Sequence, residues 1–286
     1  MTTDFETNVL YLSSLLTEID KYKPFWNRLK PILHENKIKY KLIENTRDIW
    51  CRDYMPVQIE KDKFIQFRYE PSYLDKEPNL RSDPKDVCKA NGFEPIFSNI
   101  NLDGGNVVNW DNKAIISDRI FDENPEYSDK TKLIHELENL LDVEVIIIPQ
   151  IKSDMTGHAD GMVRFVDENT ILGNDIEQEF KYWRVGMKKV LKNHHLDYVN
   201  IPFFENKKIN RKNPDNAIGC YVNYLEVGNL ILLPIFEIDG NRDRDVYELF
   251  KLTFPERIIE TINCNEIGYK GGLLNCTTWT TKETIL

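Results

Sequence analysis

The stretch GHADGMVRF, residues 157–165, places His158 two residues before Asp160, with a glycine on either side of the pair and a strand-like run after it. In an extended segment, side chains two residues apart point the same way, so both groups can face one cavity. An imidazole can transfer protons near neutral pH, and a carboxylate can hold a cation. A histidine that is simply hydrogen-bonded in a tight polar turn is the alternative. The choice depends on which other side chains the fold brings to this turn.

Polar residues at four other places in the chain also precede strand-like segments. They are Trp50-Cys51-Arg52-Asp53, Asp103-Gly104-Gly105-Asn106, Asn223 and Cys276. A thiol becomes nucleophilic when a basic or cationic neighbour helps to form the thiolate, so a nearby histidine would activate Cys276. The alternative is that Cys276 is a buried, small apolar side chain. Cys51 is a weaker candidate nucleophile, because the carboxylate of Asp53 beside it would raise its pKa.

The carboxylates of Asp53 and Asp160 would repel each other in one pocket unless a cation lay between them. A planar guanidinium fits two carboxylates through paired, charge-assisted hydrogen bonds, and Trp50 could stack on its face unless it is a core residue. A metal fits less well, since the chain has 5 histidines and neither an H-E-x-x-H nor a C-x-x-C motif. Gly104-Gly105 belongs to no phosphate-binding motif. We therefore expect a small cationic guanidino substrate, no metal and no cofactor.

Strand and helix patterns that could position these residues recur along the chain in a constant order. The first strands of successive hairpins are predicted to begin near residues 55, 105, 161, 219 and 271. Helical patterns follow the first four hairpins, at residues 83–91, 128–141, 176–192 and 241–253, and a further strand follows each helix. Ser128 is the predicted N-cap of the second of these helices. A spacing of 50 to 58 residues with a constant element order is typical of a repeat architecture.

The N-terminal segment supplies what the last hairpin lacks: a strand, a helix over residues 23–37 and a further strand. Five strand-strand-helix-strand units can close into a ring with their first strands around one axis and their helices outside. We therefore predict an α/β fold, a five-bladed α/β propeller of ββαβ units, with residues 1–286 as one catalytic domain. The entrances of the five hairpins would converge at one end of the axis. An ordinary mixed sheet with helical crossovers is the alternative, and the irregular loop at residues 70–84 is a candidate for shaping a pocket.

Composition limits the partners and the compartment. The formal net charge of −10 disfavours nucleic acid and is compatible with a cationic small molecule. The 5 cysteines show no C-x-x-C pairing, which favours a reducing compartment. The N-terminal residues lack the basic start of a signal peptide, and no run reaches the roughly 20 apolar residues of a membrane span. We expect a cytoplasmic protein without a membrane partner, and a homo-oligomer remains possible.

Five motifs, taken together and in this order, resemble the agmatine deiminase and bacterial-type peptidylarginine deiminase family. They are W-C-R-D-Y-M-P (50–56), L-D-G-G-N (102–106), G-H-A-D-G (157–161), Y-V-N-Y (221–224) and G-G-L-L-N-C-T-T (271–278). The family belongs to the guanidine-modifying pentein superfamily, whose fold is a five-bladed α/β propeller. The resemblance thus implies the same fold as the repeat pattern.

The resemblance also implies a role for each site residue. Cys276 would be the nucleophile that attacks the guanidinium carbon, and His158 the general acid and base. Asp103, where the family usually has glutamate, would orient His158. Asp53 and Asp160 would hold the guanidinium nitrogens, and Trp50 and Asn223 would be further pocket residues.

The implied reaction is hydrolysis of a guanidinium to a ureido group and ammonia through a covalent thiouronium on the cysteine. The acceptor could instead be an amine, as in an amidinotransferase, or the protein could bind a guanidino ligand without turnover. Two departures from the family concern the substrate: FRYEPSYL replaces an aromatic-Gly-Gly segment, and Asn275 replaces a histidine. Agmatine, an arginine derivative and peptidyl arginine therefore all stay open.

Overall fold

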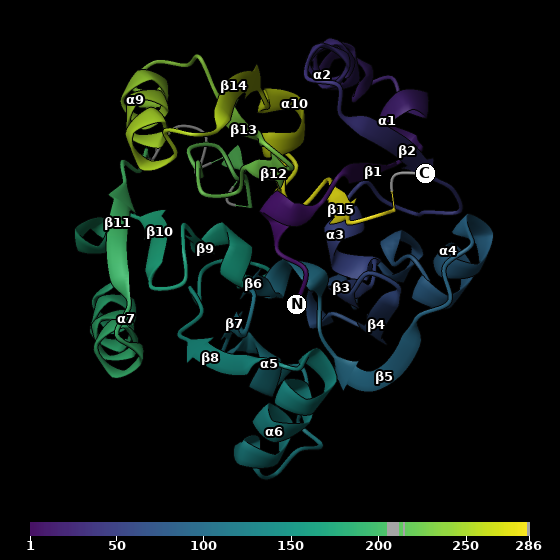
Figure 1. Ribbon diagram of the computed structural model, residues 1–286, viewed down its shortest axis with the longest axis vertical. Coiled ribbons are helices and arrows are strands. Elements are labelled where there is room, and N and C mark those ends of the chain that lie inside the picture. Colours follow the sequence, from purple (N-terminus) through teal and green to yellow (C-terminus); the bar gives the residue numbers. More distant parts are fainter. Residues whose placement is uncertain (205–211, 214, 285–286) are drawn as a thin grey trace.

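The computed structural model describes residues 1–204, 212–213 and 215–284. These residues form five three-stranded sheets, set as blades around a central axis with the longer helices on the outside (Figure 1). In each sheet the middle strand pairs antiparallel with one neighbour and parallel with the other. The predicted five-bladed α/β propeller of ββαβ units is confirmed.

Four blades come from consecutive segments, each with a hairpin, an outer helix and a returning strand. The first has β3 (Val57–Glu60), β4 (Lys63–Arg68), α4 (Pro84–Asn91) and β5 (Ile96–Asn101). The second has β6 (Val108–Trp110), β7 (Lys113–Ser117), α5 (Arg119–Asp122), α6 (Lys130–Leu141) and β8 (Glu144–Ile148). The third has β9 (Val163–Phe165), β10 (Thr170–Asn174), α7 (Lys181–His194) and β11 (Asp197–Ile201). The fourth has β12 (Leu225–Val227), β13 (Leu230–Ile235), α9 (Asp243–Thr253) and β14 (Ile258–Asn263).

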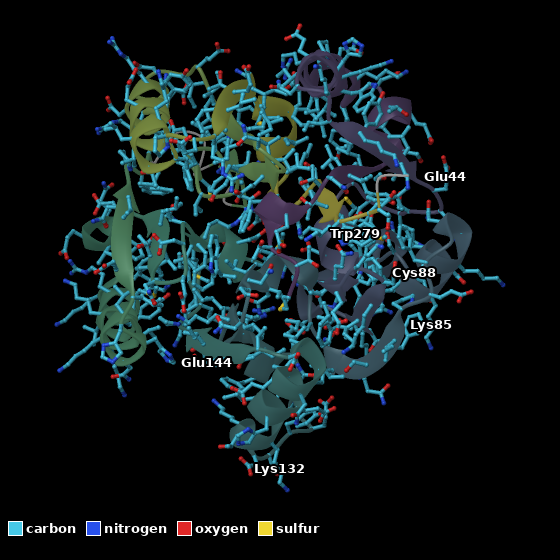
Figure 2. The ribbon with its side chains drawn as sticks, viewed as in Figure 1. Glu44, Lys85, Cys88, Lys132, Glu144 and Trp279 are labelled. Atoms are coloured by element: carbon cyan, nitrogen blue, oxygen red, sulfur yellow. The ribbon has the colours of Figure 1, made fainter. Side chains whose placement is uncertain are left out.

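The fifth blade joins both ends of the described chain, as predicted. It contains β15 (Trp279–Thr281), β1 (Val9–Ser13), α1 (Leu15–Glu18), α2 (Lys23–Glu35) and β2 (Lys39–Ile43). Val9 pairs with Thr281 on one side and with Lys39 on the other. Trp279 lies toward the inside of the ring (Figure 2), and its indole N–H donates to the Pro56 carbonyl at 2.7 Å. The closing blade is thereby hydrogen-bonded to the first.

The outer helices form where leucines or aromatic residues recur at helical spacing. In α6, Leu133, Leu137 and Leu141 are fully buried against the blades, while Lys132 projects outward (Figure 2). The N-cap of this helix is Asp129, whose side chain accepts from the Thr131 N–H, so the prediction of Ser128 was wrong by one residue. Among the helices that the structure describes, none is long and apolar enough to span a bilayer.

Three predicted boundaries differ because short turns replace regular elements. The helix predicted from residue 176 begins at Lys181, because the Asp175 side chain accepts from the Glu177 N–H and closes a separate 3-10 turn over Ile176–Gln178. The first strands of the fourth and fifth blades begin at Leu225 and Trp279 instead of residues 219 and 271.

The hairpin entrances are therefore turns rather than strand ends. Three of them are single helical turns: α3 (Cys51–Tyr54), η4 (Gly104–Asn106) and η5 (Ala159–Gly161). In these turns backbone N–H groups stay free to bond with side chains of neighbouring entrances, as Gly105 N–H does with Asp53 and Ala159 N–H with Asn106. This local geometry gathers the polar residues of separate blades.

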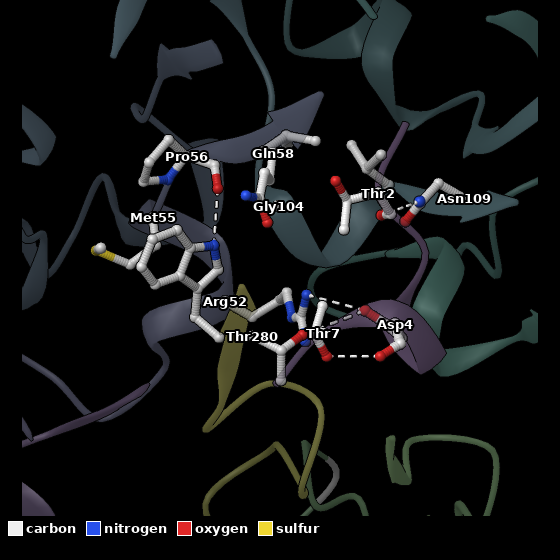
Figure 3. A pocket seen from close by; sticks show the side chains of 13 residues that line it. Thr2, Asp4, Thr7, Arg52, Met55, Pro56, Gln58, Gly104, Asn109 and Thr280 are labelled. Carbon is white, nitrogen blue, oxygen red and sulfur yellow. Dashed lines mark hydrogen bonds and ion pairs between the residues drawn. The ribbon is translucent and has the colours of Figure 1, made fainter. Parts of the chain in front are cut away.

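The segment before β1 crosses the ring near its axis (Figure 1), and its 3-10 turn η1 (Asp4–Glu6) carries a bridging carboxylate. Asp4 Oδ2 lies 2.5 Å from Arg164 Nη2 on β9, and its Oδ1 lies 3.9 Å from Arg52 Nη1 in the first entrance. Figure 3 shows Asp4 and Arg52 facing each other. Arg164 is almost fully buried, so Asp4 is its counter-charge in a poorly solvated place.

Replacing Asp4 by Asn should destabilise the fold by leaving the two arginines unpaired. We expect the free energy of unfolding to fall by about 3 kcal/mol, the lower end of what truncating one partner of a buried ion pair costs. Glu6→Gln is the matched control in the same turn, because Glu6 pairs with the exposed Lys282 at 2.8 Å. Glu6→Gln should lower the free energy of unfolding by less than about 1 kcal/mol. Denaturant unfolding curves measure both, and equal losses would contradict the bridging role.

Candidate active site

A cavity of about 480 Å³ opens where the third, fourth and fifth entrances meet. Asp160, Asn223 and Cys276 all line it, so three of the predicted site residues share one wall. His158 and Asp103 line a second, smaller pocket, and Thr156 borders both. The structure thus brings the predicted residues of separate blades into one region.

Both ring nitrogens of His158 face carboxylates. Nε2 lies 2.9 Å from Asp103 Oδ2, and Nδ1 lies 3.5 Å from Asp53 Oδ1. Burial alone would lower the pKa of His158, but the carboxylates of Asp53, Asp103 and Asp160 outweigh it and raise that pKa to about 10. The imidazole is therefore a cation at neutral pH, with two acids to hold its orientation.

The acids around His158 outnumber the cations that could neutralise them. Burial raises the pKa of Asp53 well above its ordinary value, and the charges of Asp103, Asp160 and Asp48 raise it further, while His158 opposes them. Asp53 also accepts the Gly105 N–H at 3.1 Å. A ligand that brings positive charge to these carboxylates would relieve their mutual repulsion.

Cys276 lies beside one of these acids, with Sγ 3.8 Å from Asp160 Oδ2. Burial raises the pKa of its thiol well above the ordinary value, and the charges of Asp160 and Asp53 add to the effect. The thiol is therefore protonated in the free protein, and a cation near Asp160 would favour its thiolate.

Asn223 fixes the turn that carries Cys276. Its Oδ1 accepts the backbone N–H groups of Asn275 and Cys276 at 3.1 and 3.3 Å, and its Nδ2 donates to the Asp160 carbonyl at 3.4 Å. One side chain of the fourth entrance thus ties the fifth to the third. It also lines the cavity, and its contact with a substrate stays a prediction.

Hydrogen bonds link each entrance to the next around the whole ring. Besides the Asn223 contacts they are Gly105 N–H to Asp53 at 3.1 Å, Ala159 N–H to Asn106 Oδ1 at 3.1 Å, and Arg52 N–H to the Cys276 carbonyl at 3.2 Å. The circuit runs through all five blades and closes on itself. The relative positions of nucleophile, imidazole and acids depend on this closure.

Two residues of the first entrance, Trp50 and Cys51, pack in the protein interior and do not line the cavity. The Trp50 ring lies against Gly272, where an added Cβ would come within 2.4 Å of Cζ3, and it packs on the main core. Stacking of Trp50 on a ligand stays a prediction. Cys51 is fully buried, with Sγ 3.2 Å from the Thr277 carbonyl, and burial raises the pKa of its thiol strongly. Such a cysteine is inert.

Two polar contacts of the site were not predicted. The Tyr73 hydroxyl donates to Asp103 Oδ2 at 2.9 Å, and Asn275 Nδ2 donates to Asp160 Oδ2 at 2.6 Å. Tyr73 belongs to the loop at residues 70–84, for which the sequence predicted only a contribution to a pocket. Asn275 stood out only as a departure from the resembled family, and no local pattern marks either contact.

Substituting Gly105 should displace the imidazole. A Cβ there would lie 2.6 Å from Asp53 Oδ1 and 2.7 Å from His158 Nδ1, which is closer than atoms tolerate. In Gly105→Ala we expect His158 to move away from Asp53, so its pKa should fall by about 1 to 2, the effect of losing one close carboxylate. NMR titration of the imidazole measures the change. Gly161→Ala is the control, because an added Cβ there meets nothing within 4 Å; an unchanged His158 pKa in Gly105→Ala would contradict the close packing.

Solved structures with the same fold include two agmatine deiminases. The C. jejuni agmatine deiminase has a TM-score of 0.77 at 18% identity, with 100% of this chain and 96% of that chain covered. The agmatine deiminase of Enterococcus faecalis has a TM-score of 0.77 at 16% identity and the same coverage. A Listeria monocytogenes protein provisionally named agmatine deiminase 2 is 35% identical over 68 residues. That match covers 24% of this chain and 18% of the relative's length.

The family comparison covers far more of the chain than the sequence match. The family model of the Porphyromonas-type peptidyl-arginine deiminases matches residues 14–281. That range includes all five entrances and every predicted site residue. The chain belongs to the Porphyromonas-type peptidyl-arginine deiminase family.

Proposed function

We propose that the chain is a single catalytic domain that hydrolyses the guanidinium group of a small cationic compound to a ureido group and ammonia. The observation that carries the proposal is the buried His158 between Asp53 and Asp103, in a site where Asp160 also lies 3.8 Å from the Cys276 thiol. Membership of the family and the fold shared with agmatine deiminases support it. The excess of buried acid supports a cationic substrate in particular.

In the proposed first step, Asp53 and Asp160 hold the guanidinium nitrogens, and the positive charge lowers the pKa of the Cys276 thiol, whose proton passes to solvent as the thiolate forms. The thiolate adds to the guanidinium carbon, and the imidazolium of His158 gives its proton to one amino group. Ammonia leaves and a covalent thiouronium remains on Cys276, with His158 now neutral.

In the second step, the neutral imidazole of His158 takes a proton from water, and the resulting hydroxide adds to the thiouronium carbon. The C–S bond then breaks, which returns the thiolate and the ureido product, and the product's extra proton passes to solvent. His158 serves as acid and then as base, and Asp103 holds its ring throughout.

The wall of the cavity favours a substrate whose far end is cationic. Besides Asp160, it is lined by Asp154, Glu179 and Asp215, and no lysine or arginine belongs to the part of the wall that the structure describes. An α-carboxylate among these acids would face like charges, whereas an ammonium would be attracted. We propose agmatine, or a guanidino compound with a similar cationic end, ahead of free arginine.

Replacing Cys276 by Ser or Ala should abolish turnover, because its thiolate is the nucleophile of the proposed scheme. Cys220 also lines the cavity, but burial raises the pKa of its thiol to about 12, so it should not replace Cys276. With agmatine as substrate, ammonia release should fall below detection, while the ligand should still raise the unfolding temperature. In the wild type, mass spectrometry of quenched reactions should detect the thiouronium adduct on Cys276. Full activity of the Cys276→Ala protein would overturn the mechanism.

A panel of agmatine, arginine and an arginyl peptide tests the substrate. We expect kcat/KM for agmatine to exceed that for arginine by about 100-fold, since like-charge contacts cost several kcal/mol. The double change Glu179→Gln and Asp215→Asn should reduce this preference. Ammonia and ureido product, measured without any amine acceptor, identify a hydrolase. A preference for arginine would contradict the proposed cationic end, and ligand binding without product would contradict the activity.

A further inference from the structure

One oxygen of Asp103 takes two hydrogen bonds. Oδ2 lies 2.9 Å from the Tyr73 hydroxyl and 2.9 Å from His158 Nε2. A carboxylate only accepts, so both neighbours donate to it. The Tyr73 and His158 rings also touch edge to face, with centroids 6.1 Å apart at an interplanar angle of 69°. Tyr73 therefore contacts both members of the Asp103–His158 pair.

We propose that Tyr73 is a positioning residue for His158: it fixes the Asp103 carboxylate and, by sharing Oδ2, limits how strongly Asp103 raises the proton affinity of the imidazole. The inference rests on the proposed function, in which His158 gives up a proton from Nδ1, the ring nitrogen that does not face Asp103. An acceptor that serves two donors binds each less strongly than it would bind one alone. Without the tyrosine hydroxyl, the full charge of Oδ2 would act on Nε2–H.

The backbone next to Tyr73 is held by a network outside the catalytic residues. Ser72 N–H and Oγ donate to the two oxygens of Glu123 at 3.1 and 2.7 Å. Arg119 Nη2 donates to Ser72 Oγ at 2.7 Å, and its Nε donates to Glu123 at 2.8 Å. These bonds attach the loop to the start of α5 and to the residue that ends it. The hydroxyl of Tyr73 is thus presented to Asp103 from a fixed place.

Tyr73 reaches His158 through Asp103, at the Nε2 side of the ring. It lines the smaller pocket with Asp103, His158, Arg119 and Glu123, and it does not line the cavity that reaches Cys276. Its removal should therefore change proton transfer more than substrate binding.

Several titratable groups surround this pair and set its charge. Those that act on His158 or Tyr73 are Asp53, Asp103, Asp160 and Tyr69, and Asp48 acts on Asp53 and Tyr69. Burial raises the pKa of Tyr73 well above its ordinary value, with the charge of Asp103 as a further cause. Across the smaller pocket, Arg119 and Glu123 neutralise each other at 2.8 Å. Tyr73 therefore stays protonated, and a donor, throughout the physiological range.

Tyr73→Phe removes the hydroxyl and leaves the ring. With agmatine as substrate, we expect kcat to fall about tenfold, part of the roughly 10²- to 10⁴-fold that an acid–base group contributes, with KM changed by less than about twofold. Tyr127→Phe is the matched control: its hydroxyl donates to Glu136 at 2.7 Å on the outer surface, and its loss should leave kcat unchanged. A rise in KM at constant kcat, or an unchanged kcat, would overturn the proposal.

A second measurement does not depend on turnover. In the wild type, the Nε2-bound proton of His158 should give an NMR resonance that is absent in His158→Gln. In Tyr73→Phe this resonance should move downfield, and the imidazole should titrate above the wild-type pKa of about 10. An unmoved resonance would refute the sharing of Oδ2. If the wild type hydrolysed no guanidino compound, the proposed function would fail, and this spectrum would still decide the role of Tyr73.

The double variant Tyr73→Phe with Asp103→Asn tests whether Tyr73 acts through Asp103. If it does, adding Tyr73→Phe to Asp103→Asn should not lower kcat further, because the shared acceptor charge is already gone. Effects that multiply would show that the two residues act independently and would overturn the positioning role.

Discussion

The crowding of carboxylates around one buried imidazole is the constraint on which the rest of the structure depends. Asp53, Asp103 and Asp160 all act on His158, and their charges overcome the burial that would otherwise keep it neutral. Like charges held this close repel, and a flexible scaffold would let them separate toward water. Their proximity therefore requires a rigid frame around them, together with a ligand that completes the charge balance.

The frame is a ring in which no blade holds the site alone. Asp53, Asp103 and Cys276 belong to the first, second and fifth entrances, and His158 and Asp160 share the third. Hydrogen bonds between neighbouring entrances set the distances between these groups. Backbone N–H groups and the amides of Asn106 and Asn223 make most of these links. Such bonds add no charge, so they fix the geometry without disturbing the electrostatic balance of the acids.

The blades could be predicted because hydrophobic periodicity is local information. Period-two hairpins and leucine-lined helices such as α6 recur in a constant order, and the order alone indicated a ring with convergent entrances. The residues now found near one cavity followed from that convergence. Tyr73 did not, because it lies in an irregular loop whose path is set by Ser72, Glu123 and Arg119. Asp4 did not either, because a short polar segment carries no sign that it will cross the axis.

Boundaries failed where a side chain competes with the regular backbone pattern. Asp175 closes a separate turn ahead of α7, and turns at the fourth and fifth entrances delay β12 and β15. The Asp175 cap and the Asn223 contacts to the turn before β15 are made by individual polar side chains, which periodicity does not resolve.

The sheet that joins the two ends of the chain also helps to place the nucleophile. β1 and β15 are paired although their residues stand at opposite ends of the sequence, as Val9 with Thr281, so this contact has one of the largest loop-closure costs in the molecule. Cys276 lies three residues before β15, on the segment that this pairing draws into place. Asn223 of the fourth entrance also holds the backbone of Cys276, so the thiol is fixed from both sides, by a neighbouring blade and by the pairing of the two ends. The nucleophile therefore stands at the seam where the ring closes, and any change that loosens that seam should disturb the thiol before it disturbs the acids.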